Sequence, residues 1–330
     1  MKIIQNSNSD ELTKSERQSL GILGLTLVLA CFYVFGNRTE ASFEEVSLKD
    51  NEILIAQMTD SRLDDFFESL ELKASSVLIL NSDTKQKIYG KDTDKVMPLA
   101  SLVKIMTAVV AMENIDESAI IKIPKEALGL AGDNGLLVDE QWGRDELLRF
   151  MLITSSNDAT RAISMNIGEK LGSTSEEESV KIFTDLMNAK ALSLGLPNTT
   201  FLNESGLDLE DGRNGGYSTS KEIVTLFDYA INTYPDIFSS TSFGSKNFTS
   251  ISMAEHNALN TNQSVGQVAG ISASKTGFTN ISGGNLIVSF KTLDGQTIIV
   301  NVLGSTFTER FTDIEKLSST TLKIINEVQL

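Results

Sequence analysis

Ser101 and Lys104, in the stretch "PLASLVKIMT", have the spacing of a serine nucleophile that carries its own base. Residues three apart on a helix lie on one face, so the lysine amine can reach the serine hydroxyl. A lysine buried in an apolar helix tends to lose its proton, and a neutral amine can accept a proton from serine. Free N–H groups at the helix start would stabilise a developing oxyanion. The alternative is a helix-capping serine next to a lysine whose amine reaches solvent.

The S-x-x-K spacing also occurs at three other places, which are Ser82/Lys85, Ser218/Lys221 and Ser272/Lys275. These fall on an expected hairpin turn, at the start of a peripheral helix and along a strand. Only Ser101 precedes a segment so dense in apolar residues, up to Met112, that it predicts a helix buried nearly all round. Ser101 is therefore the candidate nucleophile.

The composition of the chain narrows the chemistry further. Its single cysteine, Cys31, and single histidine, His256, exclude an internal disulfide and zinc sites built from several such ligands. No G-x-S-x-G turn is present to carry the serine of a Ser-His-Asp triad. The net charge is −16 and no Lys/Arg cluster appears, so nucleic acid is not an expected partner. We expect neither a metal nor another cofactor.

An apolar run, Leu20–Gly36, lies near the N-terminus, with basic residues before it and acidic residues after it. This charge asymmetry predicts a single-pass membrane anchor over 20–36, with residues 1–19 in the cytoplasm and the remainder outside the cell membrane. Two alternatives are a signal peptide that is cleaved before Ser42 and a lipid attached to Cys31.

The rest of the chain divides into an acidic stalk over 37–73, with one helix at 60–72, and a globular domain over 74–330. Apolar and alternating runs predict strands at 75–81, 86–90, 270–277, 283–291 and 296–304. Helical periodicity predicts helices at 101–112, 144–154, 159–172, 180–195, 220–234 and 307–328. This order predicts an α/β (α+β) fold in which both chain ends build one antiparallel sheet, flanked by helices, beside an all-helical lobe.

Two further motifs follow Ser101 and Lys104 along the chain. "SSN" at Ser155–Asn157 lies in a predicted turn between two helices, and "KTG" at Lys275–Gly277 lies on a predicted strand. Alone, the first would be a helix-capping turn and the second an edge-strand lysine with a turn glycine. Together and in this order, the three motifs resemble the serine penicillin-recognising enzymes.

Longer segments narrow the resemblance to one family. "PLASLVKIMTA", "SSNDATRAI", "LMNAKALSLGLPNTTFLNESGLD" and "SKTGFTNISGGNLI" resemble the D-alanyl-D-alanine carboxypeptidases, the low-molecular-mass penicillin-binding proteins. The resemblance covers residues 74–328 and implies a β-lactamase/transpeptidase-like fold. Departures include Glu204, where the family often has proline. Many relatives also add a β-rich domain and an amphipathic anchor, which the N-terminal apolar helix would replace here.

The resemblance also implies roles for the residues of the three motifs. Ser101 would be the nucleophile that forms an acyl-enzyme, and Lys104 its general base. Ser155 would relay a proton toward the leaving group. Asn157 would hydrogen-bond the substrate amide and steady the general base, and Lys275 would supply positive charge.

Substrate binding is implied for four residues of the "KTGFT" segment and for one arginine. Thr276 and Thr279 would hold the substrate carboxylate, while Gly277 would leave room for the substrate backbone. The backbone N–H of Phe278 and that of the nucleophile would form the oxyanion hole. Arg310 would attract the terminal carboxylate, with a solvated surface arginine as the alternative.

The implied activity is release of the terminal D-alanine from peptidoglycan stem peptides, with β-lactams as covalent inhibitors. Three alternatives stay open: a D,D-endopeptidase acting on cross-links, a class A β-lactamase, and a non-catalytic penicillin-binding sensor. The β-lactamase would need a glutamate base in a loop before K-T-G, and the nearest match, Glu255–Asn260, has the wrong spacing.

Overall fold

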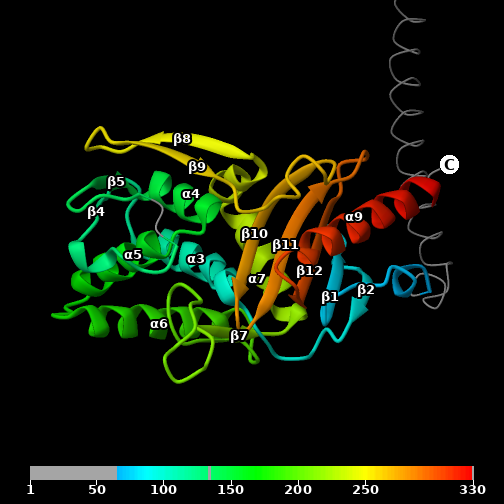
Figure 1. Ribbon diagram of the computed structural model, residues 1–330, viewed down its shortest axis with the longest axis horizontal. Coiled ribbons are helices and arrows are strands. Elements are labelled where there is room, and N and C mark those ends of the chain that lie inside the picture. Colours follow the sequence, from blue (N-terminus) through cyan, green and yellow to red (C-terminus); the bar gives the residue numbers. More distant parts are fainter. Residues whose placement is uncertain (1–64, 133–134, 329–330) are drawn as a thin grey trace, which may run out of the picture. The chain divides into compact units, whose positions relative to one another are not determined.

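The structure is a computed structural model of the 330-residue chain, and it describes residues 65–132 and 135–328 (Figure 1). The expected cytoplasmic segment, the expected anchor at 20–36 and Cys31 lie outside the described residues, as does most of the expected stalk. Within the described ranges, none of the helices has the length and apolar character needed to cross a membrane.

One antiparallel sheet of five strands organises the domain, in the order β10-β11-β12-β1-β2. The strands are β1 (Ser76–Asn81), β2 (Lys87–Lys91), β10 (Ile271–Thr279), β11 (Gly283–Lys291) and β12 (Thr297–Ser305). In the centre of the sheet, Val77 pairs with Val302 and Ile79 pairs with Val300. The strands therefore come from both ends of the domain, as the sequence predicts, and β10 forms one free edge (Figure 1).

Helices cover both faces of this sheet, with α9 (Glu309–Val328) in front and α7 (Ser220–Thr233) behind in Figure 1. The Nδ2 of Asn301, on β12, donates to the Ser220 hydroxyl at the start of α7 over 2.9 Å. On the other side, the Ser305 hydroxyl donates to Asp313 of α9 over 2.7 Å. Because both faces are covered, β12 is buried along nearly its whole length, which explains its near-continuous apolar sequence.

The second lobe is built around α3, which is buried from Lys104 to Ala111. This helix contacts α4, α5, α6 and α7. The bounds of the helices in and beside the lobe are α3 (Lys104–Asn114), α4 (Arg144–Thr154), α5 (Asn157–Lys170), α6 (Glu176–Ser193) and α8 (Pro235–Phe238), with 3-10 helices η1 (Ala100–Val103), η2 (Lys125–Ala127) and η3 (Ser239–Ser242).

The expectation of an all-helical lobe is wrong, because this part of the chain also contains seven short strands among its described residues. They are β3 (Met97–Pro98), β4 (Ile120–Lys122), β5 (Gln141–Gly143), β6 (Thr200–Phe201), β7 (Gly216–Ser218), β8 (Ser245–Thr249) and β9 (Glu255–Leu259). The hairpin of β8 and β9 escaped prediction because it buries only Phe248 and Ala258 of its strand residues. Without an apolar face, the hairpin carries no period-2 signal.

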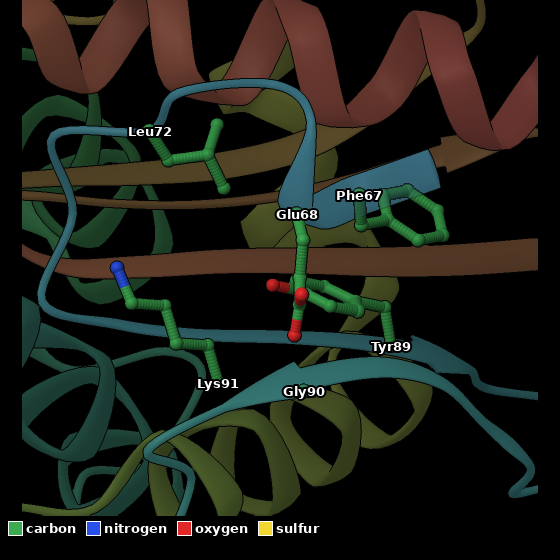
Figure 2. A pocket seen from close by; sticks show the side chains of 6 residues that line it. All are labelled: Phe67, Glu68, Leu72, Tyr89, Gly90 and Lys91. Carbon is green, nitrogen blue, oxygen red and sulfur yellow. The ribbon is translucent and has the colours of Figure 1, made fainter. Parts of the chain in front are cut away.

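Part of the segment expected to be a stalk packs against the sheet. Phe67 is fully buried and stacks on Tyr89 of β2, with ring centroids 4.7 Å apart. The Asp313 carboxylate on α9 accepts hydrogen bonds from the backbone N–H groups of Lys73 and Ala74. A small cavity of about 260 Å³ lies at this junction. Figure 2 shows the residues that line it, which are Phe67, Glu68, Leu72, Tyr89, Gly90 and Lys91.

Candidate active site

Ser101 lies in the 3-10 turn η1, which leads directly into α3, whereas the sequence predicts that Ser101 begins the helix itself. The residue before it, Ala100, has φ = 49°, a left-handed conformation that is uncommon for a residue with a Cβ. The backbone N–H of Ala100 donates to Asn214 Oδ1 over 3.1 Å. Gly206 packs so closely on this turn that a Cβ there would lie 1.9 Å from the Ala100 carbonyl oxygen. The surrounding loop therefore holds the strained turn in place.

Lys104 is fully buried, and its amine meets three oxygen atoms. The Nζ donates to Asn157 Oδ1 at 2.7 Å and to the Ser205 carbonyl oxygen at 2.7 Å, and it lies 3.0 Å from Ser101 Oγ. A neutral amine has two N–H groups and one lone pair, so two acceptors can use the N–H groups while the lone pair faces the serine O–H. This is the geometry of a base directed at Ser101.

The charge state of Lys104 fits the same arrangement. Burial lowers the pKa of its amine to about 7, and the Glu204 carboxylate opposes part of that shift. A substantial fraction of the amine is then neutral near pH 7, whereas an ordinary lysine would be almost entirely protonated.

This pKa gives the first testable prediction. Only neutral Lys104 can accept the serine proton, so the rate of acylation by a β-lactam should rise with pH through a limb near pH 7. Stopped-flow acylation rates from about pH 5 to about pH 9 would measure the limb. A rate that is independent of pH, or a limb at the ordinary lysine pKa, would contradict the assignment.

Glu204 gives a second prediction. Its carboxylate is fully buried and accepts a hydrogen bond from Arg161 Nε over 2.6 Å. Removing its charge in Glu204→Gln removes the influence that raises the Lys104 pKa, so the limb should move to lower pH. Glu176→Gln is the matched control, because Glu176 pairs with the same arginine but does not contribute to the Lys104 shift. A limb that stays in place in Glu204→Gln, or moves equally in both variants, would refute the prediction.

A second lysine approaches the site from strand β10. Lys275 is buried, and its Nζ donates to Ser155 Oγ at 2.8 Å and to the Thr276 carbonyl oxygen at 2.9 Å. Burial, followed by the positive charges of Lys104 and Arg310, holds the Lys275 pKa well below its usual value. Lys275 and Ser155 therefore form a pair in which the serine hydroxyl can pass on a proton and the lysine amine can replace it.

The turn between α4 and α5 places the "SSN" residues between these two lysines. Ser155 ends α4 with φ = 61°, and Ser156 caps α5 by accepting the Ala159 N–H over 3.1 Å. Asn157 then becomes the first residue of α5, two residues earlier than the predicted helix start. It accepts from Lys104 and donates through Nδ2 to the Ala131 carbonyl. The start of α3, the turn between α4 and α5, and strand β10 thus come together through these hydrogen bonds, and Figure 1 shows the arrangement of the three elements.

Gly277 lies against the nucleophile turn. A Cβ at this position would meet the Leu99 carbonyl oxygen at 2.8 Å, the Ser101 nitrogen at 3.2 Å and the Ala100 Cβ at 3.3 Å. The glycine therefore leaves room for the backbone of the nucleophile turn itself, in addition to any room it leaves for substrate.

The third prediction follows from this contact. Gly277→Ala should push β10 away from Ser101 and lower the acylation rate by about 100-fold, since a displacement of about 1 Å can cost that much. Acylation kinetics with a penicillin would measure it, with Gly244→Ala as the control because no atom lies within 4 Å of a Cβ there. Equal rates for Gly277→Ala and the wild-type chain would contradict this reading of the contact.

The remaining predicted substrate-binding residues lie close to this edge. Thr276 shares a hydrogen bond with Thr261 through their hydroxyls, and Thr279 Oγ1 bonds to Ser282. Phe278 is 41% exposed. Arg310 is 4% exposed, and its Nη1 donates to the Gly277 carbonyl oxygen over 2.6 Å. Carboxylate binding by the two threonines and the arginine stays a prediction.

Sequence reasoning missed Ser205 and Asn214, which support the site from the loop between α6 and α7. Ser205 supplies the carbonyl that Lys104 binds, and Asn214 holds Ala100 while its Nδ2 also reaches Thr279 Oγ1 at 3.3 Å. The glycines of this loop could have signalled a close backbone approach, but nothing in the sequence identified its target. The assembled site carries a serine with its own base and a second lysine–serine pair, which suits acyl transfer.

Comparison with known proteins agrees with this chemistry. The family model described as D-alanyl-D-alanine carboxypeptidase matches residues 64–306. The chain belongs to this family. The description of the family, and the names of the Bacillus subtilis and Streptomyces relatives, are those of D-alanyl-D-alanine carboxypeptidases, which are hydrolases.

Relatives of the chain include both carboxypeptidases and endopeptidases. It is 30% identical over 256 residues to D-alanyl-D-alanine carboxypeptidase DacF of Bacillus subtilis, covering 74% of this chain and 61% of that protein. It is 29% identical over 229 residues to a D-alanyl-D-alanine endopeptidase of Pseudomonas aeruginosa, covering 66% and 67% of the two proteins. The chain thus spans less than two thirds of the length of the Bacillus relative.

Solved structures share the fold. Penicillin-binding protein D2 of Listeria monocytogenes, in its ampicillin-bound form, superposes with a TM-score of 0.63 at 28% identity, covering 78% of this chain and 98% of that one. A mutant of the Streptomyces K15 DD-transpeptidase gives 0.67 at 25% identity, covering 75% and 97%. The expected penicillin-binding/transpeptidase-like fold, with its antiparallel sheet and helices, is confirmed.

Proposed function

We propose that the chain is a serine D-alanyl-D-alanine carboxypeptidase that removes the terminal D-alanine from peptidoglycan stem peptides. The observation that carries the proposal is the buried Lys104 amine, 3.0 Å from Ser101 Oγ, with the Lys275–Ser155 pair beside it. The solved structure of the Listeria protein with ampicillin bound supports β-lactams as ligands of this site, and they would acylate Ser101.

Acylation is the first half of the proposed reaction. Ser101 Oγ attacks the carbonyl carbon of the penultimate D-alanine while its proton passes to neutral Lys104. The negative charge on the carbonyl oxygen is stabilised by the backbone N–H groups of Ser101 and Phe278. As the C–N bond breaks, the leaving amine takes a proton from Ser155, and the proton that Lys104 received passes to Ser155, directly or by way of Lys275. Lys104 is then neutral again for the second half of the reaction.

Deacylation completes the cycle. A water molecule attacks the ester carbon, passes its proton to Lys104, and the Ser101–carbonyl bond breaks. Ser101 regains its proton, and the shortened peptide leaves with a free carboxylate. Each step uses residues of the three motifs together with the backbone N–H of Phe278, with no cofactor required.

D-alanine release tests this proposal. The purified protein is incubated with a pentapeptide ending in D-Ala-D-Ala, and with a cross-linked dimer of the same stem peptide. Release of D-alanine from the pentapeptide that is faster than cleavage of the dimer supports the carboxypeptidase. The second candidate function is that of a D,D-endopeptidase, and it is favoured by the similarity to the Pseudomonas aeruginosa protein named as an endopeptidase. It predicts faster cleavage of the cross-linked dimer. Cleavage of neither substrate would refute both.

We further propose that residues 20–36 anchor the catalytic domain outside the cytoplasm. The proposal is supported by the apolar run, the basic residues before it and the acidic residues after it. The full-length chain should stay in the membrane fraction after an alkaline carbonate wash, and so should Cys31→Ala. Release in the wash would indicate cleavage before Ser42, and loss of retention only in Cys31→Ala would indicate lipidation.

A further inference from the structure

Arg310 lies in the first turn of α9, and its side chain reaches strand β10. Its guanidinium sits among three phenyl rings, with centroid distances of 6.0 Å to Phe278, 4.9 Å to Phe307 and 4.7 Å to Phe311. The Nε is buried and has no hydrogen-bond partner among the described residues. A charged group in such surroundings is costly unless a strong acceptor faces it. The acceptor here is the Gly277 carbonyl oxygen, at 2.6 Å from Nη1.

This carbonyl belongs to the peptide unit that carries the expected oxyanion donor. The Gly277 C=O and the Phe278 N–H share one planar peptide, and none of the described peptide bonds is cis. In a trans peptide the two groups point in opposite directions. If the Phe278 N–H faces the reacting carbonyl, Arg310 therefore binds the back of the same peptide unit.

The local backbone is shaped to admit the arginine. Gly284 of β11 pairs with Phe278. A Cβ at Gly284 would lie 3.2 Å from Arg310 Cδ and 1.9 Å from the Thr306 carbonyl oxygen. Any side chain at this position would displace either the arginine or the turn before α9. The glycine thus allows the guanidinium to reach the carbonyl from within the fold.

We propose that Arg310 is a positioning residue that fixes and polarises the Gly277–Phe278 peptide, which strengthens the Phe278 N–H as an oxyanion donor. The proposal rests on the proposed acyl-transfer function. A hydrogen bond from a cation is stronger than one between neutral groups, and consecutive hydrogen bonds polarise one another. Arg310 acts through the peptide and touches no reacting atom. The competing assignment is attraction of the substrate carboxylate.

The two assignments differ in how they depend on the substrate. The kcat and KM of the wild-type chain, Arg310→Met and Arg310→Lys are measured on two thioester substrates. The two substrates differ only in the leaving group, which ends in a carboxylate in one and in its methyl ester in the other. Loss of polarisation should lower kcat by about tenfold for both, less than the 10²–10³ for removal of a whole donor. KM should change little, and Arg310→Lys should recover part of kcat. A loss confined to the carboxylate-bearing thioester would overturn the proposal.

Infrared spectroscopy of the acyl-enzyme reports the strength of the hydrogen bonds in the oxyanion hole directly, which a general loss of activity does not. The infrared stretch of the ester carbonyl in the penicilloyl-enzyme should move to higher frequency in Arg310→Met, because its hydrogen bonds in the oxyanion hole weaken. An unchanged stretch would contradict the proposal. Lys316→Met, on the same helix, is the control and should match the wild-type chain. Absence of any acyl-enzyme in the wild-type chain would instead refute the proposed function.

Discussion

Ser101→Ala is expected to reduce D-alanine release from a D-Ala-D-Ala peptide to the uncatalysed background. The hydroxyl of Ser101 is the one that the Lys104 lone pair can face, at 3.0 Å, while Ser155 Oγ pairs with Lys275. Without the hydroxyl, neither the acyl-enzyme nor its hydrolysis can occur. Release is measured by a coupled D-amino acid oxidase assay.

The matched control for Ser101→Ala is Ser82→Ala. Ser82 belongs to another S-x-x-K match, but its hydroxyl bonds to Asp228, away from the site. This variant should retain full activity. Substantial D-alanine release by Ser101→Ala would move the nucleophile elsewhere, with Ser155 as the next candidate, and Ser101→Ala/Ser155→Ala would then decide between the two serines.

Lys104→Met is expected to slow acylation by a penicillin by about 10³-fold or more, within the usual range for loss of a general base. Methionine is similar in length and apolar, so it fills the buried space along α3 without offering a lone pair that can accept the serine proton. The rate is measured by stopped-flow fluorescence with a labelled penicillin. A decrease of only a few fold would show that another group takes the proton.

The stability of Lys104→Met separates a folding defect from a catalytic one. Because the pKa of Lys104 falls to about 7 in the folded chain, the unfolded chain binds more protons between pH 7 and the usual lysine pKa. Burial of Lys104 therefore lowers the free energy of unfolding, most strongly below pH 7. This penalty shrinks as the pH rises from 7 toward the usual lysine pKa. Lys104→Met should lose this pH dependence and remain folded at pH 7. Lys85→Met, at an exposed S-x-x-K lysine, is the control.

Much of the sheet and of the helical lobe was predictable from the sequence. Strands β11 and β12 have apolar runs at their centres and are buried along nearly their full length, and α7 has a clear helical periodicity, so local pattern and final burial agree. The hairpin of β8 and β9 could not be predicted from the sequence, because most of its residues are polar and lie at least partly exposed. The hairpin is held by pairing between its strands, for example between Asn247 and Asn257, and by packing of Phe248 on Phe150 of α4. Neither contact produces a periodic pattern in the sequence.

The three motifs were also predictable, but the contacts that tune them were not. Ser205, whose carbonyl holds Lys104, lies 101 residues further along the chain. Glu204 appeared in the sequence only as a departure from a family proline, although its buried charge raises the pKa of the general base. The positive φ of Ala100 and the contact of Arg310 with the Gly277 carbonyl depend on tertiary packing, which short motifs do not encode.

The most direct test of the account is to locate the covalent adduct of benzylpenicillin on the wild-type chain. The protein is incubated with the antibiotic, and its intact mass is measured before digestion and peptide sequencing. Acyl transfer by Ser101 predicts one penicilloyl group for each chain, attached to the peptide that contains this serine. No adduct, or an adduct on a peptide without Ser101, would contradict it.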